Sequence, residues 1–166
     1  GCGGVQSAVR AAMVAAAPTL SVETATLPGS LKVLRLPRMP AALAPNAVHL
    51  VLGAGGLAAF LEPTAHGVCA LISWRGAVTI DAAADASSDG GGETKAAIDP
   101  AELSDAAEAQ AMLMAAFPTL RDALEAEEEG GPSAGAQFAA QRVSSASTVR
   151  CAAYHLSPRC VLLGDA

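Results

Sequence analysis

The feature that most constrains the fold is a series of three short apolar segments in the first half of the chain. They run from Val48 to Leu52, from Leu57 to Leu61 and from Gly67 to Trp74. Two turn signals divide them, Gly53-Ala54-Gly55-Gly56 and Glu62-Pro63-Thr64. Apolar runs of this length between glycine- and proline-containing turns are typical of β-strands that pair with their sequence neighbours. The segments therefore predict an antiparallel meander of half-buried strands.

Two more strands are expected just before the meander. Residues 21–27 and 31–36 alternate polar and apolar side chains, and Pro28-Gly29 between them is a turn signal. The prolines at positions 37, 40 and 45 then predict a loop. The sequence of this region therefore indicates strand, turn, strand and loop ahead of the meander.

Three helices are expected around these strands. Ser7 is a suitable N-cap for the alanine-rich residues 7–17, and Pro18 ends them. Asp99-Pro100 has the N-cap and N1 residues that open a helix over 101–116. The other expected elements are a helix at 120–128 and a strand-like segment at 138–150. This order predicts an α+β fold, a mostly antiparallel sheet covered by helices on one face.

Residues 81–99 differ in composition from the rest of the chain, since they are rich in Ala, Ser, Asp, Gly and Glu. Such a segment buries too little apolar surface to offset its conformational entropy, so we expect a mobile surface insert.

Charge and cysteine content exclude several classes of protein. The net charge is −6 and no basic stripe is present, which argues against nucleic-acid binding. Four cysteines lack the density and spacing of a disulfide scaffold, so we expect a reducing compartment. The longest apolar passage, residues 48–72, is interrupted by Glu62, Pro63 and His66, and it is therefore no membrane span.

The end of the chain has an unusual pattern. A turn at Ser157-Pro158-Arg159 is followed by the wholly apolar residues 160–163 and then by Gly164-Asp165-Ala166. An apolar run that stops at Gly-Asp is typical of a buried parallel strand that delivers a carboxylate to its carboxyl end. Because the sequence stops there and begins on Gly1, we expect it to be an internal piece of a longer protein.

Both ends resemble motifs of one enzyme family. GCGGVQSAVR at residues 1–10 resembles the DG motif of the FAD-dependent class A aromatic monooxygenases, the p-hydroxybenzoate hydroxylase-like family, whose pattern is roughly GxDGxxSxVR. LSPRCVLLGDA at residues 156–166 resembles the family's GD motif, an apolar strand followed by GDAAH. Within the family, VRCAAYHLSPRCVLLGDA is most similar to the kynurenine 3-monooxygenases. Two motifs in this order, separated by the length of one domain, indicate the family more strongly than either motif alone.

The resemblance implies a division of the chain and an activity. Residues 1–20 and 157–166 would be remnants of an FAD-binding Rossmann-like domain, and 21–156 the substrate-binding middle domain. In the family, FAD reduced by NADPH supplies the oxygen chemistry that hydroxylates an aromatic ring. The implied substrate is L-kynurenine, converted to 3-hydroxykynurenine, and the implied location is intracellular, at the mitochondrial outer membrane. Two alternatives stay open: another phenol or aromatic hydroxylase of the class, and a non-catalytic α+β module.

The resemblance also carries four cofactor-binding residues over to this sequence. Asp165, preceded by Gly164, would accept hydrogen bonds from the ribityl or pyrophosphate region of FAD. Arg10 would pair with a cofactor phosphate, and Gly4 belongs to the DG turn. Gly3 departs from the family, which has Asp there, and the change removes an acceptor and makes the loop more flexible.

Other sites are weaker in the sequence. No residue is assigned a catalytic role, because neither a G-x-S-x-G elbow nor a convincing G-x-G-x-x-G fingerprint is present. Cys151, His155 and Cys160 lack the tight spacing of zinc ligands, so no metal site is expected. The family's middle sheet covers the aromatic substrate, and three aromatic residues are candidates to line that pocket or to lie in the core: Phe60, Trp74 and Phe138.

Overall fold

The structure is a computed structural model that describes residues 4–80, 97–126 and 130–163. The chain divides into two compact units. The sheet unit comprises residues 29–144, and the terminal unit comprises residues 1–28 and 145–166. Both contain helices and antiparallel strands, so the α+β class is confirmed. The expected insert at 81–99 falls mostly on residues 81–96, which lie outside the described residues.

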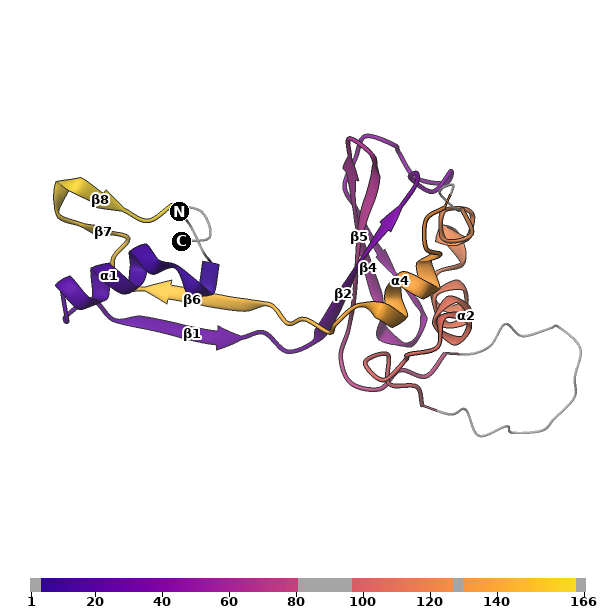
Figure 1. Cartoon of the computed structure of the whole chain (residues 1–166), viewed down its shortest axis with the longest axis horizontal. Coiled ribbons are helices and arrows are strands. Elements are labelled where there is room, and N and C mark those ends of the chain that lie inside the picture. The colour runs from indigo at the N-terminus through magenta and orange to yellow at the C-terminus, as the bar shows by residue number, and fades with distance from the viewer. Residues whose placement is uncertain (1–3, 81–96, 127–129, 164–166) are drawn as a thin grey trace, which may run out of the picture. The chain divides into compact units, whose positions relative to one another are not determined.

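The sheet unit is built on a four-stranded antiparallel sheet in the order β2-β5-β4-β3 (Figure 1). Strands β3 (His49–Leu52), β4 (Ala58–Thr64) and β5 (Gly67–Trp74) pair with their sequence neighbours, which confirms the predicted meander. Strand β2 (Ser30–Leu36) pairs with β5, with Leu34 opposite Ala70. The loop predicted from the prolines lies between β2 and β3.

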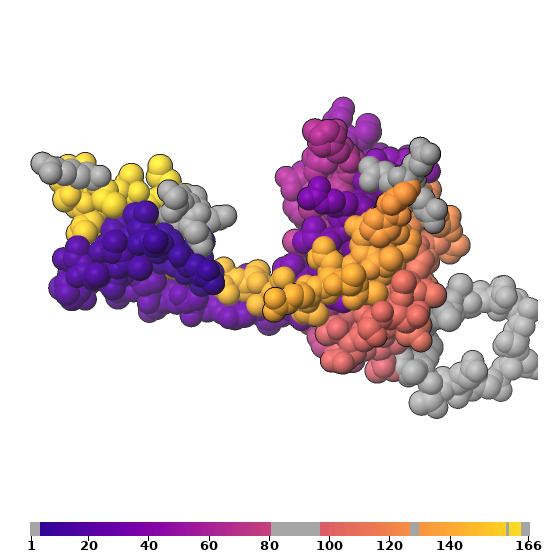
Figure 2. Space-filling view, in the orientation of Figure 1, coloured from indigo at the N-terminus to yellow at the C-terminus, as the bar shows by residue number. Residues whose placement is uncertain are grey.

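Helices cover one face of this sheet, as predicted (Figure 1). They are α2 (Ala106–Ala116), α3 (Arg121–Leu124) and α4 (Ala134–Ala140), with a 3-10 turn at Pro118–Leu120. Segments α2 and α4 form a continuous surface in Figure 2, and Gln110 of α2 joins them by accepting a bond from Gly135 N at 2.6 Å. Every second side chain of β2, β4 and β5 packs against this layer and forms the main core: Leu34, Leu36, Ala59, Leu61, Val68, Ala70, Ile72 and Trp74.

Hydrogen bonds from two glutamines occupy backbone groups at the outer edge of β2. Gln137 lies in α4, and Gln141 is its C-cap. The side-chain amide of Gln137 accepts from Arg35 N at 2.8 Å and donates to Arg35 O at 3.0 Å. Gln141 accepts from Val33 N at 3.5 Å, and Ser144 forms a bridge with Leu31. These groups satisfy backbone donors and acceptors that an edge strand otherwise leaves open to another chain.

The terminal unit has a small core of its own. Helix α1 (Ala8–Ala16) is capped by Ser7, whose hydroxyl accepts from Arg10 N at 3.2 Å, as predicted. Strands β1 (Val22–Thr26) and β6 (Ser147–Cys151) pair antiparallel. Strands β7 (His155–Leu156) and β8 (Cys160–Val161) form a short hairpin around the predicted turn. The buried members of this core are Met13, Leu20, Cys151 and Leu162.

The buried parallel strand expected at residues 160–163 is wrong for this structure. Strand β8 is antiparallel to β7, and only Leu162 of the segment is buried. Val161 is 58% exposed and Leu163 is 69% exposed. The apolar run alone predicted burial, but the turn at 157–159 folds it back onto two residues of β7 rather than into a larger sheet.

The strands expected at 21–27 and 31–36 form as β1 and β2, which pair with β6 and β5. Two other expectations are corrected. The second helix begins at Ala106, because Asp105 caps it by accepting from Ala107 N and Glu108 N, whereas Asp99 closes a turn by accepting from Ala101 N. Residues 138–140, expected in a strand, belong to α4, whose N-cap is Ser133.

Among the residues that the structure describes, no helix has both the length and the apolar character to cross a bilayer.

Candidate functional site: the open face of the sheet

Within the described part of the sheet unit, the face of the sheet opposite the helices carries several exposed apolar side chains. We call it the open face. It carries the side chains that alternate with the core residues: Leu31, Val33, Arg35, Leu50, Leu52, Ala58, Phe60, Glu62, Cys69, Leu71 and Ser73. Successive strand residues point to opposite faces, so this set follows from the observed register.

The middle of the open face is apolar. Val33, Leu71, Phe60 and Leu50 lie opposite one another across the four strands in one row. Phe60 is 44% exposed, Leu50 65% and Leu52 79%. Exposed apolar patches on a folded sheet mark surfaces that meet a ligand, a partner or another part of the protein.

The end of the open face beside the β4–β5 turn is polar. Arg35 on β2, Cys69 on β5 and Glu62 on β4 occupy one cross-strand row. His66 lies in the turn, where its backbone N–H donates to Thr64 Oγ1 at 3.3 Å. A pocket of about 560 Å³ opens here, lined by Val33, Arg35, Glu62, Pro63, Thr64, Ala65, His66, Val68 and Cys69.

The three candidate aromatic residues differ in where they lie. Phe60 lies on the open face and is available to a ligand. Trp74 and Phe138 are buried core residues, 3% and 0% exposed, with ring centroids 5.8 Å apart. Of the three, Phe60 is the one exposed on this face, outside the residues that line the pocket beside the β4–β5 turn.

The core beneath the sheet holds a buried lysine. Lys32 of β2 is 2% exposed, and its Nζ donates to Phe138 O at 2.8 Å and lies 4.4 Å from the Phe138 ring centroid. Burial lowers its pKa from the ordinary 10.5 because the low-dielectric core disfavours the charged form. Lys32 thus points away from the open face and ties β2 to the C-terminal end of α4.

Two of the four sequence-predicted cofactor residues lie in described parts of the terminal unit, and they contact each other. Gly4 begins a 3-10 turn with a φ of 52°, a left-handed conformation that favours glycine. The Arg10 guanidinium donates to Gly4 O at 2.8 Å and to Val5 O. Arg10 is 6% exposed, so this geometry makes it a support of the turn and leaves little of its fork facing solvent.

The other two predicted cofactor residues, Gly164 and Asp165, lie outside the described residues, as does Gly3. The described residues fit FAD only in part: they supply a glycine turn held by Arg10, and the Gly53–Gly56 segment is a turn between β3 and β4 rather than a dinucleotide-binding loop. No reaction step is therefore derived through the flavin.

Cysteine and histidine residues form no metal centre in the part of the chain that the structure describes. Cys69, Cys151 and Cys160 are free thiols. Cys69 belongs to the open face, whereas Cys151 is buried beside Met13 and Leu20 in the core of the terminal unit.

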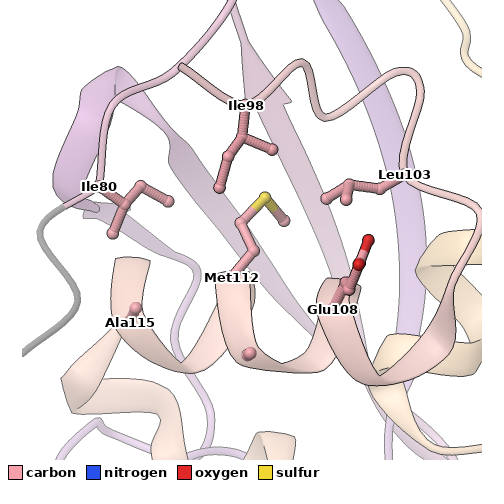
Figure 3. A pocket seen from close by; sticks show the side chains of 7 residues that line it. Ile80, Ile98, Leu103, Glu108, Met112 and Ala115 are labelled. Atoms are coloured by element: carbon pink, nitrogen blue, oxygen red, sulfur yellow. The ribbon is translucent and has the colours of Figure 1, made fainter. Parts of the chain in front are cut away.

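A second pocket, of about 440 Å³, lies on the helical side of the sheet unit. Figure 3 shows the side chains of Ile80, Ile98 and Met112 directed into one space, with the Glu108 carboxylate at its side. Ile80, Ile98, Leu103 and Met112 all belong to, or pack against, the main core. The pocket is therefore continuous with the core packing of α2.

Comparison with known proteins identifies no family, since no protein-family model and no curated protein matches the sequence.

Sequence reasoning missed most of the open face. It named Phe60 as a candidate. It did not predict that Phe60 shares one surface with Val33, Arg35, Glu62 and Leu71. Alternation in residues 31–36 already places Arg35 and Val33 on the same face. The alternation does not indicate which face the helices cover, because both faces carry apolar side chains: Val33 on one, and Leu34 and Leu36 on the other.

Proposed function

We propose that this chain is part of an FAD- and NADPH-dependent aromatic monooxygenase and that its open face covers the aromatic substrate. The proposed substrate is L-kynurenine and the proposed product is 3-hydroxykynurenine. The proposed fold is the p-hydroxybenzoate hydroxylase-like fold, and the proposed location of the protein is the mitochondrial outer membrane. The resemblance of residues 1–10 and 156–166 to the family's DG and GD motifs supports it.

One structural observation carries the proposal. In the described part of the sheet unit, helices cover one face of the sheet, and the other face holds the row Val33, Leu71, Phe60 and Leu50. A flat apolar row of this kind suits an aromatic ring, because Phe60 offers an edge or face for ring contact and the aliphatic side chains exclude water.

When bound, FAD would supply the oxygen chemistry of the reaction. The residues of this chain would bind and orient the substrate ring and keep water away from it. Arg10 would hold the Gly4 turn in shape through its bonds to Gly4 O and Val5 O.

The test is to express the protein from its complete gene and measure bound flavin and substrate-stimulated NADPH oxidation. We expect L-kynurenine to stimulate oxidation and mass spectrometry to detect a product one oxygen atom heavier. Phe60→Ala should raise KM about 10-fold or more, because it removes a ring contact worth about 1.4 kcal/mol or more. As a matched control, Phe117→Leu changes a core aromatic residue away from the open face.

Absence of bound flavin in the complete protein would refute the proposal and favour the non-catalytic module. Stimulation by phenols and not by L-kynurenine would favour another hydroxylase of the class. The 166-residue chain alone should be inactive, so flavin turnover by it would contradict the assignment as part of a larger enzyme.

A further inference from the structure

Strand β3 is one edge of the four-stranded sheet, and in the described part of the chain no strand pairs with its outer side. We propose that two copies of this chain pair through this edge, β3 against β3 and antiparallel, so that their two sheets become one. The inference goes beyond the proposed function, because it involves neither a cofactor nor a substrate. It is carried by the backbone groups, the side chains and the symmetry of the edge.

The register shows which backbone groups of β3 face outward. Gly53 N donates to Leu57 O at 2.8 Å where the pairing of β3 with β4 ends. In an antiparallel pair, residues that exchange hydrogen bonds alternate with residues that do not. Val51 therefore bonds to β4, whereas the N–H and C=O groups of Leu50 and Leu52 face away from the sheet. An added strand would bond to these groups.

Strand β3 lacks the residues that commonly prevent edge pairing. Its sequence, HLVL, contains no proline and no Lys, Arg, Asp or Glu. Its histidine, His49, is held within the same copy, with Nε2 2.8 Å from Ala44 O. The opposite edge of the sheet differs, since Gln137 and Gln141 bond to backbone groups of β2. Two copies that pair through the edges of the described sheet must therefore both use β3.

Pairing of β3 with itself imposes a two-fold axis, the commonest symmetry of protein dimers. With the axis at Leu50 and normal to the sheet, Leu50 lies opposite Leu50 of the second copy, and Leu52 lies opposite Val48. By alternation all three residues direct their backbone groups outward, so this register forms a hydrogen-bonded pair at each of them. Moving the axis to Val51 would instead set Val48 opposite the 3-10 turn that begins at Ala54.

The side chains at this edge are apolar and exposed. Val48 is 53% exposed, Leu50 65% and Leu52 79%. In the proposed pair the two copies of Leu50 meet, so the apolar row that contains Phe60 continues from one open face into the other. No charge is present at these positions of β3, so no like charges face each other across the axis.

The small size of the edge sets the strength of the association. A few residues from each copy bury less surface than the about 1,000 Å² of a stable interface, so we expect a weak dimer. Its Kd should lie between about 10 μM and about 1 mM.

The first experiment measures sedimentation velocity and translational diffusion of the 166-residue chain from about 10 μM to about 1 mM. We expect the mass to rise from that of one chain toward that of two. Amide shifts should change with concentration in β3 and stay constant in β2. In a mixture of isotope-labelled and unlabelled chain, intermolecular NOEs should join Leu50 to Leu50 and Leu52 to Val48.

Two substitutions of Leu50 test the side chain and the backbone separately. Leu50→Lys places two cations opposite each other and should weaken association about 10-fold or more. Leu50→Pro removes the outward N–H, which β4 does not use, and should weaken association by a similar factor. The matched control is Val143→Lys, which adds the same charge at a 41% exposed residue next to the bridge of Ser144 with β2. It should leave association unchanged.

A chain that stays monomeric up to about 1 mM would overturn the inference and leave the edge to an extended segment of a different protein. Equal weakening by Leu50→Lys and Val143→Lys, or intermolecular NOEs from elements other than β3, would overturn it as well. Circular dichroism checks that each variant is folded. If Leu50→Pro does not fold, Leu50→Lys and the NOEs decide the outcome.

Discussion

Lys32 is a charged residue placed where an apolar one would normally pack. Its Nζ has a carbonyl and an aromatic ring as partners, and no carboxylate contacts it among the described residues. Both partners stabilise the cation, but burial outweighs them, since the pKa is lowered. A buried cation of this kind lowers stability and makes it depend on pH.

The sign of that dependence follows from the direction of the shift. Below its folded-state pKa, Lys32 is charged in both states and the burial penalty is complete. As the pH rises from there to the unfolded value of 10.5, the folded protein binds fewer protons than the unfolded chain, so Lys32 makes stability rise.

We therefore predict that the free energy of unfolding of the wild type, measured relative to Lys32→Met, increases with pH in that window. The slope can reach about 1.4 kcal/mol per pH unit for one group. Urea denaturation at a series of pH values checks it. A difference between the two proteins that stays constant up to about pH 10 would contradict the lowered pKa.

At the residue scale, the sequence predicted roles that depend on neighbouring residues better than it predicted which side chains are buried. Ser7 was recognised as an N-cap because the hydroxyl and the following alanines are local features. The burial of Lys32 and the core position of Phe138 were not readable, because they depend on α4 packing against β2, and Lys32 and Phe138 are 106 positions apart. Arg10 was predicted to pair with a cofactor phosphate, and its hydrogen bonds to Gly4 O and Val5 O were not predicted, because the turn sets them.

At the scale of elements, the β4–β5 hairpin is the best-predicted part of the sheet, and a glycine limits what it tolerates. Gly67 begins β5 with a φ of 115°. A Cβ at this position would overlap Leu36 O of the neighbouring strand β2. Gly67 thus serves both the turn and the close approach of two strands.

We predict that Gly67→Ala lowers the free energy of unfolding by about 3 kcal/mol, the sum of backbone strain and overpacking. The control is Gly76→Ala, since Gly76 also has a positive φ of 64° but has open space where the new methyl group would lie. It should lose only about 1 kcal/mol. Thermal and urea unfolding of both variants measure the difference, and equal losses would show that the contact with Leu36 O has no effect.

Element prediction succeeded where neighbours in sequence are neighbours in space. The meander β3–β4–β5 has turns of a few residues, and its apolar runs are read directly. The pairing of β1 with β6 joins Val22 to Cys151, a contact that no local pattern indicates. Helix α4 was missed because its seven residues are too few for a clear helical period, and its stability comes from Gly135 packing against α2.

At the scale of the whole molecule, the residues that the structure describes form two hydrophobic cores that share no residue. One is centred on the sheet and α2, and the other on Met13, Leu20, Cys151 and Leu162. Proteins open in cooperative units that follow such contact groups. The two cores should therefore lose protection separately.

Met13→Ala should remove amide protection from α1, β1 and β6 and leave that of β2, β4 and β5 close to wild type. The loss of a buried methionine side chain costs about 2–5 kcal/mol, which is enough to open a small core. Leu113→Ala, in the main core, should give the opposite pattern. Hydrogen exchange measured by NMR distinguishes them, and a uniform loss of protection in both variants would show a single cooperative unit.

The candidate site was only partly predictable at this scale. The two end motifs suggested the family, and the middle of the chain was expected to cover a substrate. The surface proposed for that role is defined by register across β2, β5, β4 and β3, which brings Arg35 and Glu62 into one row although they are far apart in sequence. Gly164 and Asp165, on which the sequence-based prediction relied most, lie outside the described part of the chain.

Gln137 and Gln141 occupy backbone groups at the edge of β2, so the two edges of the sheet differ in their ability to pair with another strand. An incoming strand finds the positions beside Val33 and Arg35 already taken by Gln137 and Gln141, so within the described four-stranded sheet it can join only beside β3. If two copies paired through their β3 edges, the open backbone groups of each β3 would be bonded to the other copy. The product would be a closed pair that cannot lengthen into a fibre.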